Sequence, residues 1–230
     1  MYIVIAGGGL MGLSLAEQLV SHKHDVLVID PDPAVCEYAQ AEIGTMVFCG
    51  TATSTKTLEA VGLRRAQIVV AMMRNDADNL AFILLAKSYG VERRLVRMRE
   101  KPFEQAYLLA GATAICSSVD PLIDQMIVNI EYPEIKALMR IGKRDIDVFE
   151  VTVPKDAQVA GMSVEAIAQT MALPPTCNFV AVENEQGTME IARGQTVVPG
   201  GTNVILLTKE VDLELVIRLL TQTRSGRPVA

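Results

Sequence analysis

The amino-acid sequence predicts an α/β protein in which a doubly wound parallel sheet is followed by a crossover helix and a small α+β domain. Three observations predict this fold. Short apolar runs alternate with longer amphipathic segments in the first half of the chain, a glycine-rich loop follows the first run, and the pattern changes from about residue 142. Aromatic residues make up only 4% and Trp is absent, so aliphatic side chains must form the cores, as in a buried parallel sheet.

Six apolar runs in the first half have the length and composition of buried strands. They cover residues 2–6, 26–29, 46–48, 68–72, 95–98 and 114–116. Amphipathic segments with helical spacing lie between them, at residues 10–20, 34–43, 58–61, 79–89 and 104–110. Strands and helices that alternate in this way are joined by right-handed crossovers, which predicts a Rossmann-like domain.

A further helix is expected after the sixth strand. Its apolar residues recur at helical spacing and form one stripe: Val119, Leu122, Ile123, Met126, Ile127 and Ile130. Pro133 interrupts this helix. The stripe has two possible uses, since it can cap the sheet or cross onto a second subunit. We group this helix with the parallel sheet in a first domain, residues 1–140.

The remaining residues predict a second domain, residues 141–222. The expected order is a strand at 147–153, a helix at 163–171, a hairpin of strands at 179–183 and 189–191, a strand at 203–208 and a helix at 211–220. This β-α-β-β-β-α order is typical of a small α+β domain. Residues 223–230 are expected to be a disordered tail.

Charge and cysteine spacing exclude several classes of protein. The formal net charge is −6, which argues against a nucleic-acid partner. The four cysteines lie far apart without a CxxC pair, and the only two histidines, His22 and His24, have no third ligand nearby, so no metal is expected. We therefore expect lone, reduced cysteines and a cytoplasmic protein. The first strand starts at residue 2 and no run reaches the ~20 apolar residues of a membrane span, so neither a signal peptide nor a span is expected.

A phosphate-binding loop is predicted directly after the first strand. The segment Gly7-Gly8-Gly9-Leu10-Met11-Gly12 has the pattern G-x-G-x-x-G and directly precedes a helix. In such a loop Gly7 permits the tight turn, Gly9 allows the backbone to approach a pyrophosphate, and Gly12 allows close contact between helix and strand. The helix N-terminus offers free N–H groups to the anion. Alone, three consecutive glycines can also be an ordinary turn.

Asp30 strengthens the prediction because it ends the second strand, roughly 20 residues beyond the loop. An acid there accepts hydrogen bonds from both hydroxyls of an adenosine ribose, and its charge disfavours the 2′-phosphate of NADP. The alternative is that Asp30 is only a turn residue before Pro31.

The motifs along the chain resemble the regulator-of-potassium-conductance (RCK) family, the cytosolic subunits of Trk- and Ktr-type potassium-uptake systems. Those in the first half are the glycine loop with Asp30, Gly50-Thr51-Ala52-Thr53, the segment 71–79, Val96-Arg97-Met98 and Gly111-Ala112-Thr113. Those that follow are Ile130-Glu131-Tyr132-Pro133 and the segments 159–164 and 197–204. Each motif is loose, and their order across both predicted domains makes the resemblance specific.

The resemblance implies a nucleotide site and its residues. Gly7, Gly9 and Gly12 would flank the phosphates together with Leu10 and Met11 of the loop. Asp30 would bind the ribose, and Thr51, Ala52 and Thr53 would lie near the adenine. Met72, Met73 and Arg74 would line the second half of the cleft, and Arg97 would reach toward phosphate. Arg97 lies in an apolar strand, where an unpaired charge is unfavourable, so an internal salt bridge with Asp76 or Asp78 is the alternative.

Departures from the family pattern reduce the number of ligands that we expect. ATP-binding members carry an Arg in the loop where this chain has Leu10, which favours NAD(H) or ADP over ATP. Met73 replaces a Thr after the fourth strand. Ser118-Val119 replaces a Pro-Glu pair, which argues against an acidic metal site between subunits.

The function implied is regulatory: the chain would sense a nucleotide and gate a membrane potassium channel or transporter at the inner face of the membrane. Homodimers would assemble into a tetrameric or octameric ring. The alternative is a soluble NAD-dependent oxidoreductase, which needs a proton-transferring residue beside the nicotinamide. No His lies at a later strand end, and no Tyr-x-x-x-Lys pair occurs, so we expect no enzymatic activity. A transcriptional regulator would need a helix-turn-helix or a basic face, and neither is evident.

Overall fold

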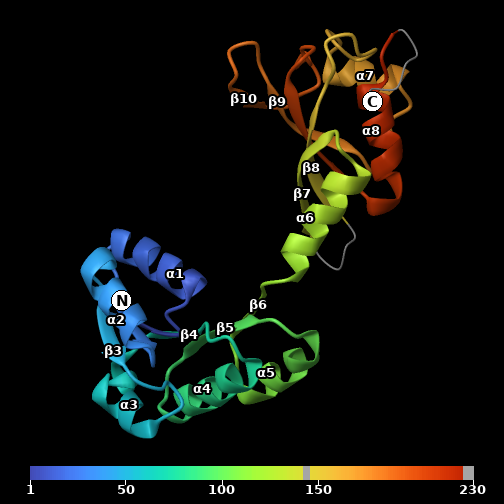
Figure 1. Cartoon of the computed structure of the whole chain (residues 1–230). Helices are drawn as coiled ribbons and strands as arrows, with labels where there is room; N and C mark the ends of the chain where they lie inside the picture. The colour runs from blue at the N-terminus through green and yellow to red at the C-terminus, as the bar shows by residue number, and fades with distance from the viewer. Residues whose placement is uncertain (142–145, 225–230) are drawn as a thin grey trace. The chain divides into compact units, whose positions relative to one another are not determined.

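The chain folds into two compact units, Met1–Pro121 and Leu122–Ala230, in a computed structural model that describes residues 1–141 and 146–224 (Figure 1). The first unit holds a six-stranded parallel sheet in the order β3-β2-β1-β4-β5-β6. Its strands are β1 (Tyr2–Ala6), β2 (Asp25–Asp30), β3 (Met46–Cys49), β4 (Ile68–Ala71), β5 (Arg93–Met98) and β6 (Ala114–Ser117). This strand order is that of a dinucleotide-binding Rossmann fold and confirms the predicted doubly wound sheet.

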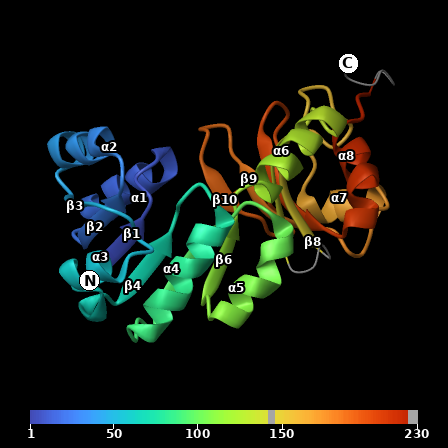
Figure 2. The ribbon, with the colours of Figure 1, turned by 60° about the horizontal axis from the view of Figure 1, so that its bottom comes forward.

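Helices cover both faces of this sheet. They are α1 (Leu10–Ser21), α2 (Pro33–Tyr38), α3 (Thr55–Ala60), α4 (Asp76–Ser88) and α5 (Glu104–Ala110). Short turns add a π-helix at Ala39–Ile43 and 3-10 helices at Leu63–Arg65 and Lys101–Phe103. One face packs against Leu58 of α3, Phe82 of α4 and Tyr107 of α5, and the opposite face packs against Ala16 of α1. Figure 2 shows α4 and α5 side by side along the sheet.

The alternation of burial along each strand follows from this two-sided cover. In β1, Val4 and Ala6 face the α3–α5 side, whereas Ile3 and Ile5 face α1. Successive side chains of a strand point to opposite faces, so a strand covered on both faces must be apolar throughout. This is why the strands appear in the sequence as continuous aliphatic runs.

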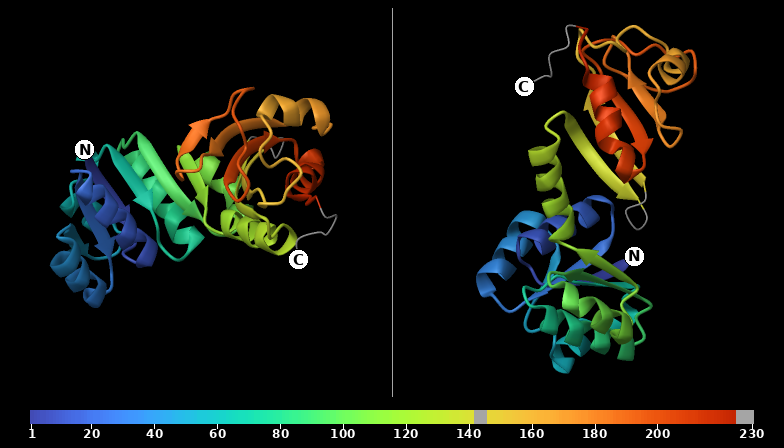
Figure 3. Two further views of the ribbon diagram at one scale, coloured as in Figure 1. Left: turned by 90° about the horizontal axis from the view of Figure 1, so that it is seen from above. Right: turned by 90° about the vertical axis from the view of Figure 1, so that its right-hand side faces the viewer.

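The second unit is built on a five-stranded antiparallel sheet in the order β10-β9-β11-β8-β7 (Figure 3). Its strands are β7 (Ile135–Ile141), β8 (Ile146–Thr152), β9 (Asn178–Glu183), β10 (Met189–Ile191) and β11 (Asn203–Thr208). The helices are α6 (Asp120–Glu131), α7 (Val164–Thr170) and α8 (Leu213–Thr221), with a 3-10 turn at Glu210–Asp212. Val128 of α6, Ile167 of α7 and Leu220 of α8 share one core with Phe149 and Leu206 of the sheet. A small α+β domain is confirmed.

Three features differ from the sequence-based expectation. Strand β7 was not predicted, and it pairs with β8 along its length. Helix α6 was grouped with the parallel sheet, whereas its buried residue Val128 packs in the second core, which places most of α6 in the second unit. Of the expected tail, Thr223 is only 5% exposed and forms a β-bridge with Ala157, and residues 225–230 lie outside the described part of the chain.

The expectation of four unpaired cysteines is wrong, because Cys36 and Cys49 form a disulfide with a Cα–Cα separation of 6.1 Å. Parallel pairing of β2 with β3 sets Cys49 beside Asp30. Helix α2, which carries Cys36, begins three residues after Asp30. A sequence separation of 13 residues therefore becomes a direct contact. Cys116 and Cys177 are free thiols. No helix within the described residues has the length and apolar character needed to cross a bilayer.

Candidate nucleotide-binding cleft

A cavity of about 590 Å³ lies at the carboxyl ends of the parallel strands, where the strand order reverses between β1 and β4. Ligands of open α/β sheets bind at this switch point. The structure brings all thirteen predicted site residues to this cavity: Gly7, Gly9, Leu10, Met11, Gly12, Asp30, Thr51, Ala52, Thr53, Met72, Met73, Arg74 and Arg97.

The glycine loop forms the floor where α1 begins. Gly7 has a φ of +107°, and a Cβ there would lie 2.8 Å from the backbone of Met72 and Met73. A Cβ at Gly12 would collide with the Gly7 carbonyl oxygen. Gly9 is the N-cap of α1 and provides no side-chain cap, and a Cβ on it would meet no neighbour within 4 Å. The first N–H groups of α1 thus face a space that an anion can enter.

Asp30 is held in place by backbone donors of the cleft. Its Oδ2 accepts a hydrogen bond of 2.6 Å from Gly8 N, and its Oδ1 accepts one of 2.9 Å from Asp32 N. A carboxylate has about four acceptor positions, so these two bonds leave capacity for ribose hydroxyls. The hydrogen bond from Gly8 N links Asp30 to the glycine loop. An ordinary turn residue before Pro31 would not need this link.

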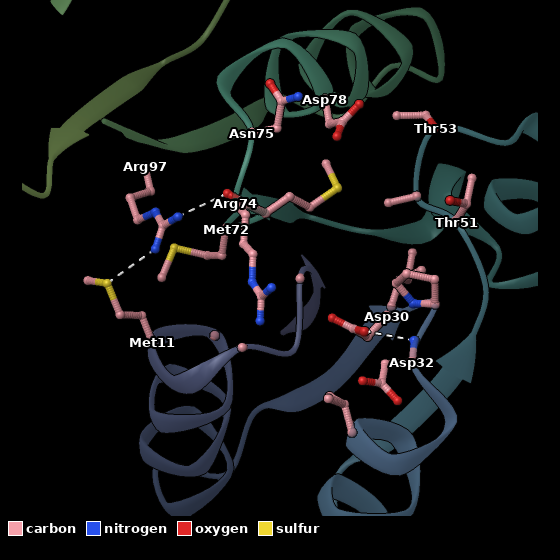
Figure 4. Close-up of a pocket in the computed structure, with 18 of the residues that line it drawn as sticks. Met11, Asp30, Asp32, Thr51, Thr53, Met72, Arg74, Asn75, Asp78 and Arg97 are labelled. Atoms are coloured by element: carbon pink, nitrogen blue, oxygen red, sulfur yellow. Dashed lines mark hydrogen bonds between the residues drawn. The ribbon is translucent and has the colours of Figure 1, made fainter. Parts of the chain in front are cut away.

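The turn after β4 is fixed by one buried amide. Asn79 is fully buried, its Oδ1 accepts a hydrogen bond of 2.9 Å from Met73 N, and its Nδ2 donates to Met73 O at 3.1 Å. Both polar groups of the Met73 backbone are therefore satisfied by the first turn of α4. Met72, Met73 and Arg74 are presented along the cleft wall, and Figure 4 shows the Arg74 side chain extending into the cleft.

Arg97 enters the cleft from β5 on the side of the glycine loop (Figure 4). One terminal nitrogen donates to Met73 O at 3.0 Å and the other lies 3.4 Å from the sulfur of Met11. Its Nε is buried and has no hydrogen-bond partner. A cation paired only with a carbonyl and a thioether lacks a counter-charge, which an anionic ligand would supply.

The alternative of a salt bridge from Arg97 is not realised in the described structure. Arg97 forms no ion pair there with either Asp76 or Asp78. The buried Asp76 carboxylate instead accepts hydrogen bonds from the Tyr107 hydroxyl at 2.7 Å and from Glu100 N at 3.0 Å. Burial, followed by the contact with Asp76, raises the pKa of Tyr107 above its ordinary value.

Sequence reasoning missed several residues of the lining. These are Ile29, Pro31, Asp32, Val35, Asn75 and Asp78. Pro31 and Asp32 directly follow Asp30, and Val35 lies in α2, where its Cγ1 is 2.6 Å from the position that a Cβ on Gly8 would take. For Pro31, Asp32 and Asn75, the signal available in the sequence was their position shortly after the end of a strand.

The charges of the cleft are separated. Asp30 and Asp32 lie at one end and Asp78 lies near Thr53, whereas Arg97 lies beside Met11 and Arg74 extends into the cleft (Figure 4). The cleft thus offers acceptors for hydroxyl and amino groups at one end and cations for phosphate at the other. The described lining contains no His, Tyr, Lys or Cys, and no group of three metal-ligating side chains occurs among the described residues.

The chain is similar in sequence and in fold to known proteins. The family model of the TrkA-N domain matches residues 3–118, which is half of the chain. The "Trk system potassium uptake protein TrkA homolog" of Methanothermobacter thermautotrophicus is 29% identical over 210 residues, which cover 91% of this chain and 94% of that protein.

Two solved structures share the fold at low sequence identity. The GsuK channel bound to NAD matches with a TM-score of 0.65 and 19% identity over 96% of this chain and 40% of that chain. GsuK bound to ADP matches with a TM-score of 0.51 and 19% identity over 58% of this chain and 35% of that chain. This chain therefore spans less than half the length of those channel chains. The match of the family model to the whole parallel-sheet unit, together with a relative aligned over nearly its full length, shows that the chain belongs to the TrkA-N domain family.

Proposed function

We propose that this chain is a cytosolic regulatory subunit that senses an adenine nucleotide and gates a membrane potassium channel or transporter. The observation that carries the proposal is the cleft at the switch point, with Asp30 oriented by Gly8 N at one end and the unpaired Nε of Arg97 at the other. Potassium uptake by the Trk system is what the name of the aligned relative states. The fold is shared with a channel that was solved with NAD and with ADP.

The ligand we propose is NAD(H) or ADP rather than ATP. Asp30 would accept hydrogen bonds from the ribose hydroxyls, the loop of Gly7, Gly9 and Gly12 would contact phosphate, and Arg97 would neutralise it. Thr51, Ala52 and Thr53 would lie along the adenine. Leu10 is 85% exposed at the mouth of the cleft and adds no cation for a third phosphate.

Identification of the bound nucleotide tests this proposal. Protein purified without added ligand is denatured, and the released nucleotides are separated and identified by mass spectrometry. Isothermal titration with NAD, NADH, ADP and ATP then gives the order of affinities. Absence of binding to all four nucleotides would overturn the proposal.

The proposed regulation of a pore involves more than one copy of this chain. The stripe on α6 remains exposed in the single chain, with Leu122 at 58%, Ile123 at 50%, Met126 at 52%, Ile127 at 41% and Ile130 at 78%. Exposed apolar patches of this kind mark interaction surfaces. We propose that α6 packs on a second copy, and that such dimers assemble into a tetrameric or octameric ring whose shape depends on the ligand.

The regulatory activity is testable in vesicles. A Trk-type pore subunit is reconstituted into liposomes and potassium flux is measured with and without this chain, each with and without NAD or ADP. We expect the flux to depend on both additions together, because a ligand shifts an equilibrium only through its differential affinity for two states. A potassium flux that is the same with and without this chain in every condition would contradict the proposal.

The alternative is an NAD-dependent oxidoreductase, for which the described lining of the cleft offers no His, Tyr, Lys or Cys as a proton-transferring residue. The Tyr107 hydroxyl donates a hydrogen bond to Asp76 inside the core, and the Tyr89 hydroxyl donates one to Thr55 O at the surface. Neither of them lines the cleft. Loss of NADH absorbance in the presence of candidate carbonyl substrates would support the enzyme over the regulator.

A further inference from the structure

The Cys36–Cys49 disulfide lies directly beside the Asp30 turn. Asp30 is the β-sheet partner of Cys49, and the sulfur of Cys36 is 3.4 Å from the Asp30 carbonyl oxygen. The same carbonyl accepts a hydrogen bond of 2.9 Å from Gly50 N. The neighbours of the two cysteines are also part of the cleft, because Val35 and Thr51 both line it. The disulfide therefore joins the two segments that form the Asp30 end of the cleft.

Helix α2 has little buried surface of its own, and its C-terminal end continues into the π-helix Ala39–Ile43, in which Ala39 is fully buried. Helix α2 is six residues long, and Cys36, at 8% exposure, is its only buried residue. Short helices with little buried apolar surface open locally at low free energy. A covalent link from Cys36 to the end of β3 restricts that opening, and with it the movement of Asp32 and Val35.

We propose that Cys36 and Cys49 are a reversible thiol–disulfide pair that adjusts nucleotide affinity to the redox state of the cell. The effect on affinity and the choice of a switch over a permanent brace both rest on the proposed function, whereas the formation of the disulfide does not. Disulfides in reducing compartments are usually transient and redox-sensing, so a disulfide in a cytosolic subunit agrees with a switch better than with a permanent brace.

The exchange reaction balances with a low-molecular-weight thiol as the reductant. Its thiolate attacks the sulfur of Cys49, because Cys49 is the exposed cysteine of the pair. A mixed disulfide forms on Cys49 while Cys36 leaves as a thiolate. A second thiolate attacks the external sulfur of this mixed disulfide and releases Cys49. Two electrons pass to the protein, both cysteine thiolates take up protons, and one small-molecule disulfide is formed. A low-molecular-weight disulfide reverses these steps.

Reduction should loosen the Asp30 end of the cleft. The Cys36 thiol is then free to donate a hydrogen bond to the Asp30 carbonyl oxygen, but α2 is no longer tied to β3. A site that must order on binding has lower affinity than a preorganised one, so we expect reduced protein to bind NAD or ADP about three- to tenfold more weakly.

The test uses the full chain with Cys116→Ser and Cys177→Ala, which removes the two other thiols. Oxidised and dithiothreitol-reduced samples are compared by alkylation and peptide mass spectrometry, by amide hydrogen exchange over residues 31–36 and 49–53, and by titration with NAD and ADP. A Cys36→Ser, Cys49→Ser variant in the same background is the matched control. It should exchange and bind like reduced protein under both conditions.

The outcomes separate the two proposals. A linked 36–49 peptide with slower exchange and tighter binding in the oxidised sample is the expected result. A redox-dependent exchange rate without nucleotide binding in either state would retain the redox pair and reject the proposed ligand. Failure of the disulfide to form in a glutathione-type redox buffer would overturn the inference. Equal exchange rates together with affinities equal within twofold in the two states would also overturn it.

Discussion

The backbone N–H of Gly8 donates a hydrogen bond of 2.6 Å to the Asp30 carboxylate. This bond connects the glycine loop to the end of β2, so the proposed phosphate and ribose ends of the cleft are joined by a direct hydrogen bond. Replacement of Asp30 therefore removes an anchor of the loop together with the proposed contact to the ribose.

Asp30→Ala should weaken binding of adenine nucleotides by about 1–3 kcal/mol, since buried partners are left unmatched. Isothermal titration of NAD and ADP measures the change. Asp25→Ala, an exposed acid at the opposite end of the same strand, is the matched control and should bind normally. Equal affinity for Asp30→Ala and wild type would remove Asp30 from the site.

Arg97→Met should lower affinity for nucleotides but not for adenosine, because the guanidinium is expected to meet phosphate. Loss of a charge-assisted hydrogen bond weakens binding by about 1.5–3 kcal/mol. Arg93→Met, at the exposed start of β5, tests for a general charge effect. Equal losses for adenosine and ADP in Arg97→Met would instead indicate a structural role.

Leu10→Arg should raise affinity for ATP selectively. Leu10 is exposed at the cleft mouth, so the longer side chain meets no packing barrier and can reach a terminal phosphate. The gain expected from one charge-assisted contact is about 1.5–3 kcal/mol. Leu10→Met controls for side-chain length. Wild-type protein that already prefers ATP over ADP by a hundredfold would contradict the argument.

Ile123→Asp together with Ile127→Asp should convert an oligomer into monomers. Both residues are exposed in the single chain, so the carboxylates leave its core intact, but burying them unpaired between chains is strongly unfavourable. Light scattering at micromolar concentration measures the change. Asn129→Asp places a carboxylate on the same helix outside the stripe and should leave the oligomer intact. A wild-type monomer at all concentrations would refute the interface and the ring.

Cys177 should react far more slowly with iodoacetamide than Cys116. Burial, assisted by Asp212, raises the pKa of Cys177 to about 12, so its reactive thiolate is scarce at pH 8 and becomes more abundant as the pH rises. Cys116 is exposed on β6. Peptide mass spectrometry of the alkylated protein gives both rates. Comparable rates at pH 8 would show that the partly buried position of Cys177 does not protect its thiol in solution.

Much of the fold could be predicted because its signals are local. The bounds of β1, α5 and β11 follow from apolar runs and caps alone. Strand β7 was missed because Pro133 marks an ending just before it and Leu138 interrupts the alternation of apolar and polar residues. Its identity as a strand depends on pairing with β8, which is a tertiary property.

In the cleft, too, features set by local sequence could be predicted and features set by tertiary pairing could not. Gly7, Gly12 and Asp30 were predicted from spacing, because their roles depend on backbone geometry next to a strand end. The bond from Gly8 to Asp30 and the Cys36–Cys49 disulfide depend on which strands lie side by side, and sequence spacing does not specify that. Asp78 was missed because its position in the first turn of α4 is also that of an ordinary dipole-compensating acid.

Asn79 has a consequence for binding kinetics. Its two hydrogen bonds to Met73 complete the turn after β4 without any ligand, so this wall of the proposed site is ordered before a nucleotide binds. Association then needs no slow folding step at that wall, and entry is governed by diffusion and by the side chains at the mouth, Leu10 and Met11. Changes at Asn79 should therefore slow association, whereas changes at Arg97 should shorten the lifetime of the complex.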